Sequence, residues 1–267
     1  MDALALLRLQ IEWGADEALA DAPIDRLAAP PPDAVVPPRV RALPMARPAP
    51  GAVAGPPVVA RAREIADAAR TRDELRAALE AFDGCPLKAT ATNLVFADGD
   101  PDSGLMLVGE GPGAEEDRAG LPFVGPSGQF LDRMLASIGL DRGKYLITNV
   151  IPWRPPGNRN PTDNEVLICL PFLLRHIALV RPRRLVLLGA MAARSVTGSS
   201  DGIRRMRGRW LQVAIPGLDA PIPGLPTLHP AYLLRTPGAK RDAWADLLLL
   251  RRSLDDDAAG RDVKDAR

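Results

Sequence analysis

The chain has 267 residues and is 46% hydrophobic, which suffices for one large hydrophobic core or two small ones. Its formal net charge of +1 excludes a uniformly basic protein, so a nucleic-acid-binding surface would have to be a local patch. The two widely separated cysteines predict no disulfide framework and a reducing, cytoplasmic compartment, and neither a membrane span nor a secretory signal is expected.

The N-terminal part differs in composition from the rest. Residues 1–20 carry apolar side chains at helical spacing and are expected to form a short amphipathic helix. This helix would either dock on the same chain or bind a partner. Residues 21–60 are rich in alanine and proline and predict an extended linker. A folded domain is expected over residues 61–255, followed by a polar tail at 256–267.

Within that domain, apolar runs alternate with helical patterns. A helical segment is expected first, over residues 61–82, with a capping box at its middle. The apolar runs, which predict strands, cover residues 104–109, 144–151, 184–189 and 226–229. The later helices are expected near residues 127–138, 163–180, 190–197 and 240–253. The alternation predicts an α/β fold, a three-layer α/β/α sandwich with a central four-stranded, mostly parallel sheet. Ligands of such sheets bind beyond the carboxyl ends of the strands.

Motifs of functional interest follow these strand ends. A glycine-rich segment at 109–117 lets the backbone approach a ligand closely, but it lacks the Gly-Lys-Ser/Thr ending of a phosphate-binding loop. By itself it is also compatible with an ordinary turn. Phe123, in a Gly/Pro loop, is placed to present its ring to a flat base. Asn149 has a carboxamide suited to pair with the edge of a base, or to form a turn.

Basic residues and one histidine complete the candidate set. Arg154 and Arg159 lie in a proline-rich loop typical of phosphate contacts. A second basic cluster is either a DNA-binding surface or a solvated face, and it contains Arg204, Arg205, Arg207 and Arg209. His229 follows a predicted strand and is a candidate catalytic residue, whereas His176 lies within a predicted helix and is expected to be structural.

Five motifs in this order carry a resemblance to a known family. They are GEGPG at 109–113, GLPFVG at 120–125, TNV at 148–150, RPPGNR at 154–159 and HPAYLLR at 229–235. Over roughly residues 80–250, the chain resembles the uracil-DNA glycosylase superfamily, and most closely its family four. The resemblance implies a monofunctional DNA-repair enzyme that flips uracil out of single- or double-stranded DNA and hydrolyses its N-glycosidic bond.

The resemblance also implies roles for the residues in these motifs. Phe123 would stack on the flipped uracil, Asn149 would pair with its O4 and N3–H, and His229 would donate a hydrogen bond to O2. Glu110 would position water or stabilise the sugar cation, because the aspartate that many relatives carry one residue later is replaced by Gly111. The remaining substrate-binding positions would be Gly109, Gly113 and Glu116, where the glutamate takes the space that an aromatic residue fills in many relatives.

The same resemblance predicts how DNA is held. Leu233 or Leu234 would be the apolar wedge that fills the gap left by the flipped base, with a pair of core leucines as the alternative. The DNA-contacting basic residues would be Arg154, Arg159, Arg207 and Arg235. The partner is therefore uracil-containing DNA, and a monomer located in the cytoplasm, on the nucleoid when bound to DNA, is expected.

The chain departs from family four at its cofactor. That family normally holds a four-iron–four-sulfur cluster on four cysteines, and the corresponding positions here read Phe82, Cys85, Trp153 and Cys169. Phenylalanine and tryptophan do not ligate iron, so we predict no cluster and no metal. The two aromatic side chains are expected to fill the vacated volume, and the two thiols to be inert.

Three other functions are each less compatible with the sequence. A non-catalytic reader of uracil or abasic DNA would keep Phe123 and Asn149, but the presence of both Glu110 and His229 argues against it. A relative that links covalently to DNA would need a histidine in the loop at 150–162, which has none. A hydrolase of small nucleotides would not need the basic loops near residues 154 and 204.

Overall fold

The computed structural model describes residues 56–258, so the predicted helix at 1–20 and most of the predicted linker at 21–60 lie outside the described part. The first described helix, α2, begins at Pro56, five residues before the predicted start of the folded domain. The last described helix, α10, continues to Ala258 and so includes the first residues of the predicted tail. Among the described helices, none combines the length and apolar character needed to cross a membrane.

A six-stranded sheet forms the centre of the domain, in the order β1-β3-β2-β4-β6-β5. The inner four strands are parallel, and the two edge strands are antiparallel to their neighbours. The strands are β1 (Ala97–Gly99), β2 (Leu105–Gly109), β3 (Leu146–Asn149), β4 (Arg184–Leu188), β5 (Leu211–Val213) and β6 (Ile222–Thr227). The α/β class is confirmed, but the predicted count of four strands was too low. Each edge strand has only three residues, too few to give a recognisable apolar run.

Helices surround the sheet. They are α2 (Pro56–Ala68), α3 (Arg72–Ala81), α4 (Ala114–Ala119), α5 (Pro126–Ala136), α6 (Asp163–Val180), α7 (Ala190–Thr197), α8 (Ile203–Met206), α9 (Pro230–Arg235) and α10 (Lys240–Ala258). The predicted ranges for α6 and α7 are confirmed, and the segment predicted at 61–82 divides into α2 and α3. Thr71 separates them because its hydroxyl accepts the N–H of Glu74 and caps α3.

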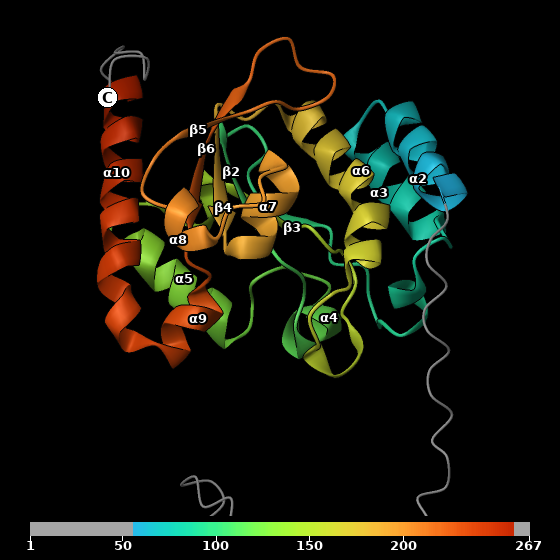
Figure 1. Ribbon diagram of the computed structural model, residues 1–267, viewed down its shortest axis with the longest axis horizontal. Helices are drawn as coiled ribbons and strands as arrows, with labels where there is room; N and C mark the ends of the chain where they lie inside the picture. Colours follow the sequence, from blue (N-terminus) through green and yellow to red (C-terminus); the bar gives the residue numbers. More distant parts are fainter. Residues whose placement is uncertain (1–55, 259–267) are drawn as a thin grey trace, which may run out of the picture. The chain divides into compact units, whose positions relative to one another are not determined.

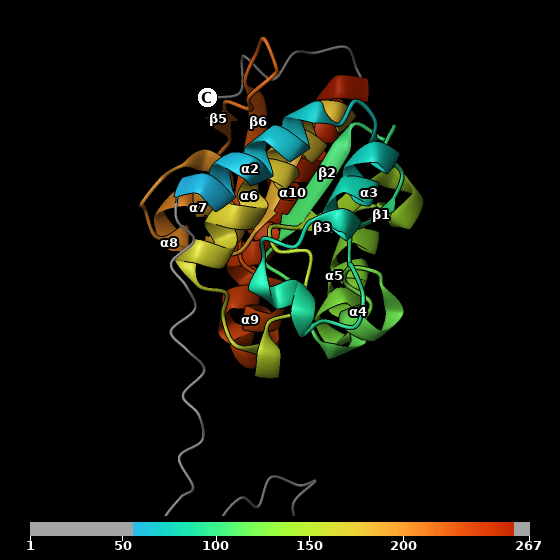
Figure 2. The same ribbon diagram turned by 90° about the vertical axis from the view of Figure 1, so that its right-hand side faces the viewer.

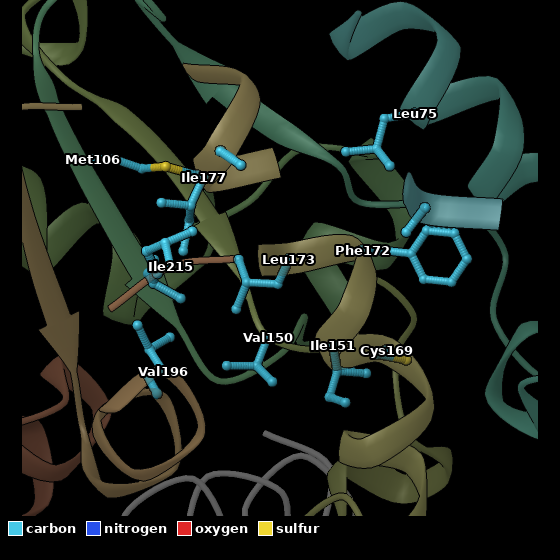
Figure 3. Packing of buried hydrophobic residues seen from close by; sticks show 14 of the residues in the cluster. Leu75, Met106, Val150, Ile151, Cys169, Phe172, Leu173, Ile177, Val196 and Ile215 are labelled. Carbon is cyan, nitrogen blue, oxygen red and sulfur yellow. The ribbon is translucent and has the colours of Figure 1, made fainter. Parts of the chain in front are cut away.

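The sheet separates two hydrophobic cores, because successive strand residues point to opposite faces. Met106, Leu185 and Leu187 belong to the core on one face of the sheet. Helices α2, α3, α6 and α7 cover this face, as Figures 1 and 2 show. Figure 3 shows this core, with Leu75, Phe172 and Leu173 among the labelled side chains. The alternate strand residues, such as Leu107, point to the face covered by α5 and α10. The three layers are thus helices, sheet and helices.

Candidate active site

A cavity of about 850 Å³ lies where the loops following β2, β3, β4 and β6 meet. These are the carboxyl ends of the four parallel strands, where the ligands of such sheets bind. The cavity brings together nine of the predicted site residues: Glu110, Gly111, Gly113, Glu116, Phe123, Asn149, Arg159, His229 and Arg235.

Asn149 is the last residue of β3, and its side chain is only 5% exposed. Its Oδ1 is buried without a hydrogen-bond partner among the described residues. An unsatisfied buried acceptor is costly, so this oxygen is a candidate to accept a hydrogen bond from a group bound in the cavity. Gly109, on the neighbouring strand β2, makes room for this amide: a Cβ there would lie 2.5 Å from Oδ1 and 2.4 Å from Cζ of Phe123.

Phe123 has a left-handed backbone conformation, with φ of 57°, which is unusual for a residue with a side chain. Its ring packs against the cavity, with its centroid 5.9 Å from that of His229 and the two planes tilted by 35°. Gly128 lies against its backbone, and a Cβ at that glycine would come within 1.8 Å of the carbonyl oxygen of Phe123. The ring is therefore held on one wall of the cavity by packing on several sides.

His229 is the N-cap of α9, and its Nδ1 accepts the N–H of Ala231 at 3.2 Å. In the neutral imidazole, the hydrogen must then be on Nε2, which makes that nitrogen a donor. Burial lowers the pKa of His229 to about 4, aided by the charge of Arg235 and opposed by Glu116. At neutral pH, this histidine is an uncharged hydrogen-bond donor.

Glu110 comes directly after β2 and lines the same cavity. Burial raises the pKa of its carboxyl group, and the positive charge of Arg194 opposes the shift. Its backbone carbonyl accepts the N–H of Ile151 at 3.0 Å, so the loops after β2 and β3 are paired beyond the strands. A carboxylate with a raised pKa is suited to accept a proton from water.

Glu116 joins two loops of the site. Its Oε2 accepts the N–H of Gly113 at 3.0 Å, and its Oε1 accepts the N–H of Gly125 at 2.8 Å. A Cβ at Gly113 would lie 2.8 Å from Oε2, so the carboxylate occupies the space that a side chain at 113 would need. The glycine and the glutamate are thus sterically linked.

The predicted DNA-contacting arginines differ in their surroundings. Arg235 is exposed at the cavity rim. Arg159 also lines the cavity, but its guanidinium makes two hydrogen bonds to the buried carboxylate of Glu165, at 2.6 and 2.9 Å. Arg154 donates to Asn158 Oδ1 at 2.7 Å and does not line the cavity. Arg159 and Arg235 are thus both exposed and line the cavity, but Arg159 is paired with Glu165.

Two other predicted DNA-contacting residues lie in the protein interior. Arg207 has a side chain only 17% exposed, because it forms an ion pair with the buried Asp246 at 2.8 Å. Leu233 is fully buried, whereas Leu234 is 42% exposed. The structure therefore does not bring Arg207 or Leu233 to the surface, and of the two leucines only Leu234 is accessible to DNA.

The cavity also includes residues that the sequence analysis did not single out. Gly189, after β4, has φ of 94°, and a Cβ there would lie 3.0 Å from Cβ of His229. Its position at the end of the strand predicted at 184–189 was the available signal. Tyr232 also lines the cavity, and its hydroxyl accepts a hydrogen bond from Arg204 at 3.3 Å.

The residues at the family's iron–sulfur positions do not fit such a cluster. Phe82, Cys85, Trp153 and Cys169 are all at most 3% exposed and belong to one hydrophobic core. The two thiol sulfurs are 3.8 Å apart, and the ring of Phe82 packs on that of Phe172 with centroids 5.1 Å apart. Four thiolates are the usual ligands of these clusters, and two apolar aromatic side chains stand in place of two of them. Within residues 56–258, no group of three or more His, Cys, Asp or Glu side chains is arranged to hold a metal.

Comparison with known proteins shows the family to which the chain belongs. Residues 96–248, more than half of the chain, match the uracil DNA glycosylase superfamily. The type-4 uracil-DNA glycosylase of Pyrobaculum aerophilum is 39% identical, over 62% of this chain and 86% of that protein. The type-4 enzyme of Thermotoga maritima is 42% identical, over 57% of this chain and 77% of that protein. The type-5 uracil-DNA glycosylase of P. aerophilum is 35% identical, over 37% of this chain. The chain belongs to the uracil DNA glycosylase superfamily and, within it, to type 4.

Proposed function

We propose that this protein removes uracil from DNA by hydrolysing the N-glycosidic bond, leaving an abasic site. The observation that carries the proposal is the unsatisfied Oδ1 of Asn149, buried beside Phe123 and His229 in one cavity. The type-4 relatives are named for this activity.

Recognition requires that the nucleotide leave the base stack, because the glycosidic carbon is hidden in a duplex. The flipped uracil stacks on Phe123, and its N3–H donates to the unsatisfied Oδ1 of Asn149 while Nδ2 donates to O4. Cytosine has no hydrogen on N3 and carries an amino group at C4, so it would leave the amide mispaired. Uracil in either single-stranded or double-stranded DNA is expected to be a substrate, because the cavity takes an extruded nucleotide from both.

Cleavage breaks the bond between C1′ and N1, and the electron pair moves onto the uracil ring. The Nε2–H of neutral His229 donates to O2, where the negative charge gathers, and this type of donor contributes about 3–4 kcal/mol to the transition state. Water attacks C1′ and gives a proton to the Glu110 carboxylate. The raised pKa of that carboxyl group supports its role as the base.

Gly113 and Glu116 would border the C5 position of the bound base and so decide which substituents fit there. Because residue 113 has no side chain, the Glu116 carboxylate is the group beside it. We propose that some 5-substituted uracils are tolerated, since a carboxylate held by two backbone N–H groups leaves more room than an aromatic ring. Absence of release of every 5-substituted base tested would rule this out.

Contact with the DNA strand is assigned to Arg235 and Arg154 for phosphates and to Leu234 for the gap in the duplex. The exposure of Leu234 supports its role as the wedge, and Leu233 is then a core residue. Arg159 contributes less because Glu165 neutralises it. The expected monomeric state and the nucleoid location stay predictions.

We also propose that the enzyme works without an iron–sulfur cluster. The aromatic side chains of Phe82 and Trp153, packed in the core with the two thiols, support this. Phe82→Cys with Trp153→Cys would restore four thiols, and we expect the double variant to take up iron while the wild type does not. Iron analysis of the two purified proteins checks this, and about four iron atoms per wild-type chain would contradict it.

The test of the main proposal is uracil release from a single-stranded oligonucleotide and from a U:G duplex. Wild type is expected to release uracil from both, and His229→Ala to lose about 100- to 1000-fold in rate. Tight binding of uracil-containing DNA by wild type with no release would instead identify a non-catalytic reader. Hydrolysis of free deoxyuridine in preference to the oligonucleotides would identify a nucleotide hydrolase.

A further inference from the structure

The left-handed backbone of Phe123 needs an explanation, because a phenylalanine rarely adopts that conformation without support. Two consecutive carbonyl groups at this bend accept hydrogen bonds from one side chain. Nη1 of Arg142 donates to the carbonyl of Pro122 at 3.3 Å, and its Nη2 donates to the carbonyl of Phe123 at 2.5 Å. One guanidinium thus holds the backbone carbonyls on both sides of the Phe123 Cα.

Two carboxylates fix this guanidinium in turn. Nε of Arg142 donates to Asp132 on α5 at 2.8 Å, and Nη1 donates to Asp98 on β1 at 3.1 Å. The hydroxyl of Tyr145 donates to the same carboxylate of Asp132 at 3.0 Å. The network therefore ties the Phe123 loop to an edge strand and to a helix of the domain, and none of these four side chains lines the cavity.

The planar shape of the guanidinium is what allows this arrangement. Its nitrogens lie in a rigid fork, so they reach two carbonyls and two carboxylates at once. An ammonium group is a single point of charge and cannot span the same four acceptors. The side chains of this network are partly exposed. Unlike an ordinary surface ion pair, however, the network requires the planar geometry of an arginine side chain.

We infer that Arg142, held by Asp132 and Asp98, is a positioning residue that keeps the Phe123 ring in place for stacking on the base. The inference rests on the proposed function, because it assumes that Phe123 contacts uracil. Arg142 touches no reacting atom and acts through the backbone of the loop.

The first test is inhibition of the wild type and variants by free uracil, since the free base probes stacking without the rest of the DNA. We expect Arg142→Gln to raise the inhibition constant about tenfold above the wild-type value. Arg142→Lys should also have a raised inhibition constant, because lysine cannot replace the guanidinium. In a Phe123→Leu background, the same Arg142→Gln change should have little further effect, because the ring through which it acts is gone. Full additivity of the two changes would overturn the inference.

Arg184 offers a matched control, because its guanidinium is also saturated, by Asp257 and Ser253, but it lies at the start of β4, away from the cavity. Arg184→Gln should lower Tm while leaving the inhibition constant unchanged. An equal rise in the inhibition constant for Arg184→Gln would show a general loss of structure and overturn the inference.

A crystal structure of Arg142→Gln tests the inference without relying on uracil. We expect residue 123 to leave the left-handed region and its ring to move from the cavity wall. An unchanged φ and ring position would overturn the inference. If the wild type neither binds nor releases uracil, the proposed function fails, and this structure still decides whether Arg142 sets the conformation of Phe123.

Discussion

The cavity and the core around the two cysteines differ in the polar groups that they contain. In the cavity, Asn149 keeps a buried acceptor that has no hydrogen-bond partner within residues 56–258, and His229 presents its Nε2–H. Around Cys85 and Cys169, aromatic side chains occupy the two other positions where family four carries metal-binding thiolates, and the surroundings are apolar. We propose that a bound base completes the unsatisfied polar group in the cavity, and that apolar packing takes the place of a metal site around the two cysteines. The comparison predicts that changes in the cavity alter activity, and that changes near the cysteines alter stability.

The largest effect is expected for Asn149→Ala. Losing both hydrogen bonds to the base should lower kcat/KM for uracil-DNA by about 100-fold or more, because the site then leaves the base's polar edge unpaired. The same change removes a buried acceptor that costs stability, so Tm should not fall. Steady-state kinetics and calorimetry on one preparation check both parts. A lower Tm with normal kinetics would mean that Asn149 is a structural residue.

The next largest effect is expected in how the rate of uracil release depends on pH. Burial raises the pKa of Glu110 above its ordinary value of 4.5, so its carboxylate is lost as pH falls through that raised value, and release should fall with it. His229 stays neutral over this range because its pKa is about 4. The acid limb of the pH–rate profile should therefore lie above pH 4.5 and disappear in Glu110→Gln, whose plateau is lower. A limb that persists in the variant would assign it to another group.

Arg235 and Arg207 separate DNA contact from folding. Arg235→Ala should weaken DNA binding several-fold, because a phosphate contact is lost. It should also reduce the slope of log K against log salt concentration by about 1. Arg207→Ala should leave that slope unchanged and lower the free energy of unfolding by about 3–5 kcal/mol, because it strands the buried Asp246 carboxylate. Binding titrations at several salt concentrations and denaturant unfolding distinguish the two. A reduced slope for Arg207→Ala would show that Arg207 contacts a DNA phosphate.

The smallest effect on activity is expected near the cysteines. Phe82→Ala should lower the free energy of unfolding by about 3–5 kcal/mol, because it opens a cavity in the core next to Phe172. The rate of uracil release at a temperature where the variant is folded should match that of the wild type. A selective loss of activity without loss of stability would connect this core to the reaction.

Sequence reasoning succeeded where the chemistry is local and failed where it depends on partners distant in the chain. Three of the inner strands were predictable because burial on both faces makes them continuous apolar runs, as in β4. The fourth, β6, contains two prolines and a glycine, and only its last two residues fall within the run predicted at 226–229. The edge strand β1 reads Ala-Asp-Gly and carries no such signal. The sequence shows the charge of Arg207 but not its partner Asp246, which follows 39 residues later. It also does not show which of two adjacent leucines in α9 faces the core.

The support of Phe123 shows a further limit. Its Gly/Pro loop marked it as a candidate for contact with a base, but neither its left-handed conformation nor the role of Arg142 has a local signature. Asp98, Asp132 and Arg142 come from three separate segments, which only the folded sheet brings together.

The central claim is that one chain keeps a working base-excision pocket while lacking the family's iron–sulfur cluster. The most direct measurement is uracil release by a purified wild-type sample whose iron content and visible absorption are determined at the same time. We predict an active, colourless protein without iron. An active protein that contains iron and absorbs near about 400 nm, the region of thiolate-bound clusters, would contradict the loss of the cluster. A colourless protein without uracil release would contradict the assignment of the pocket.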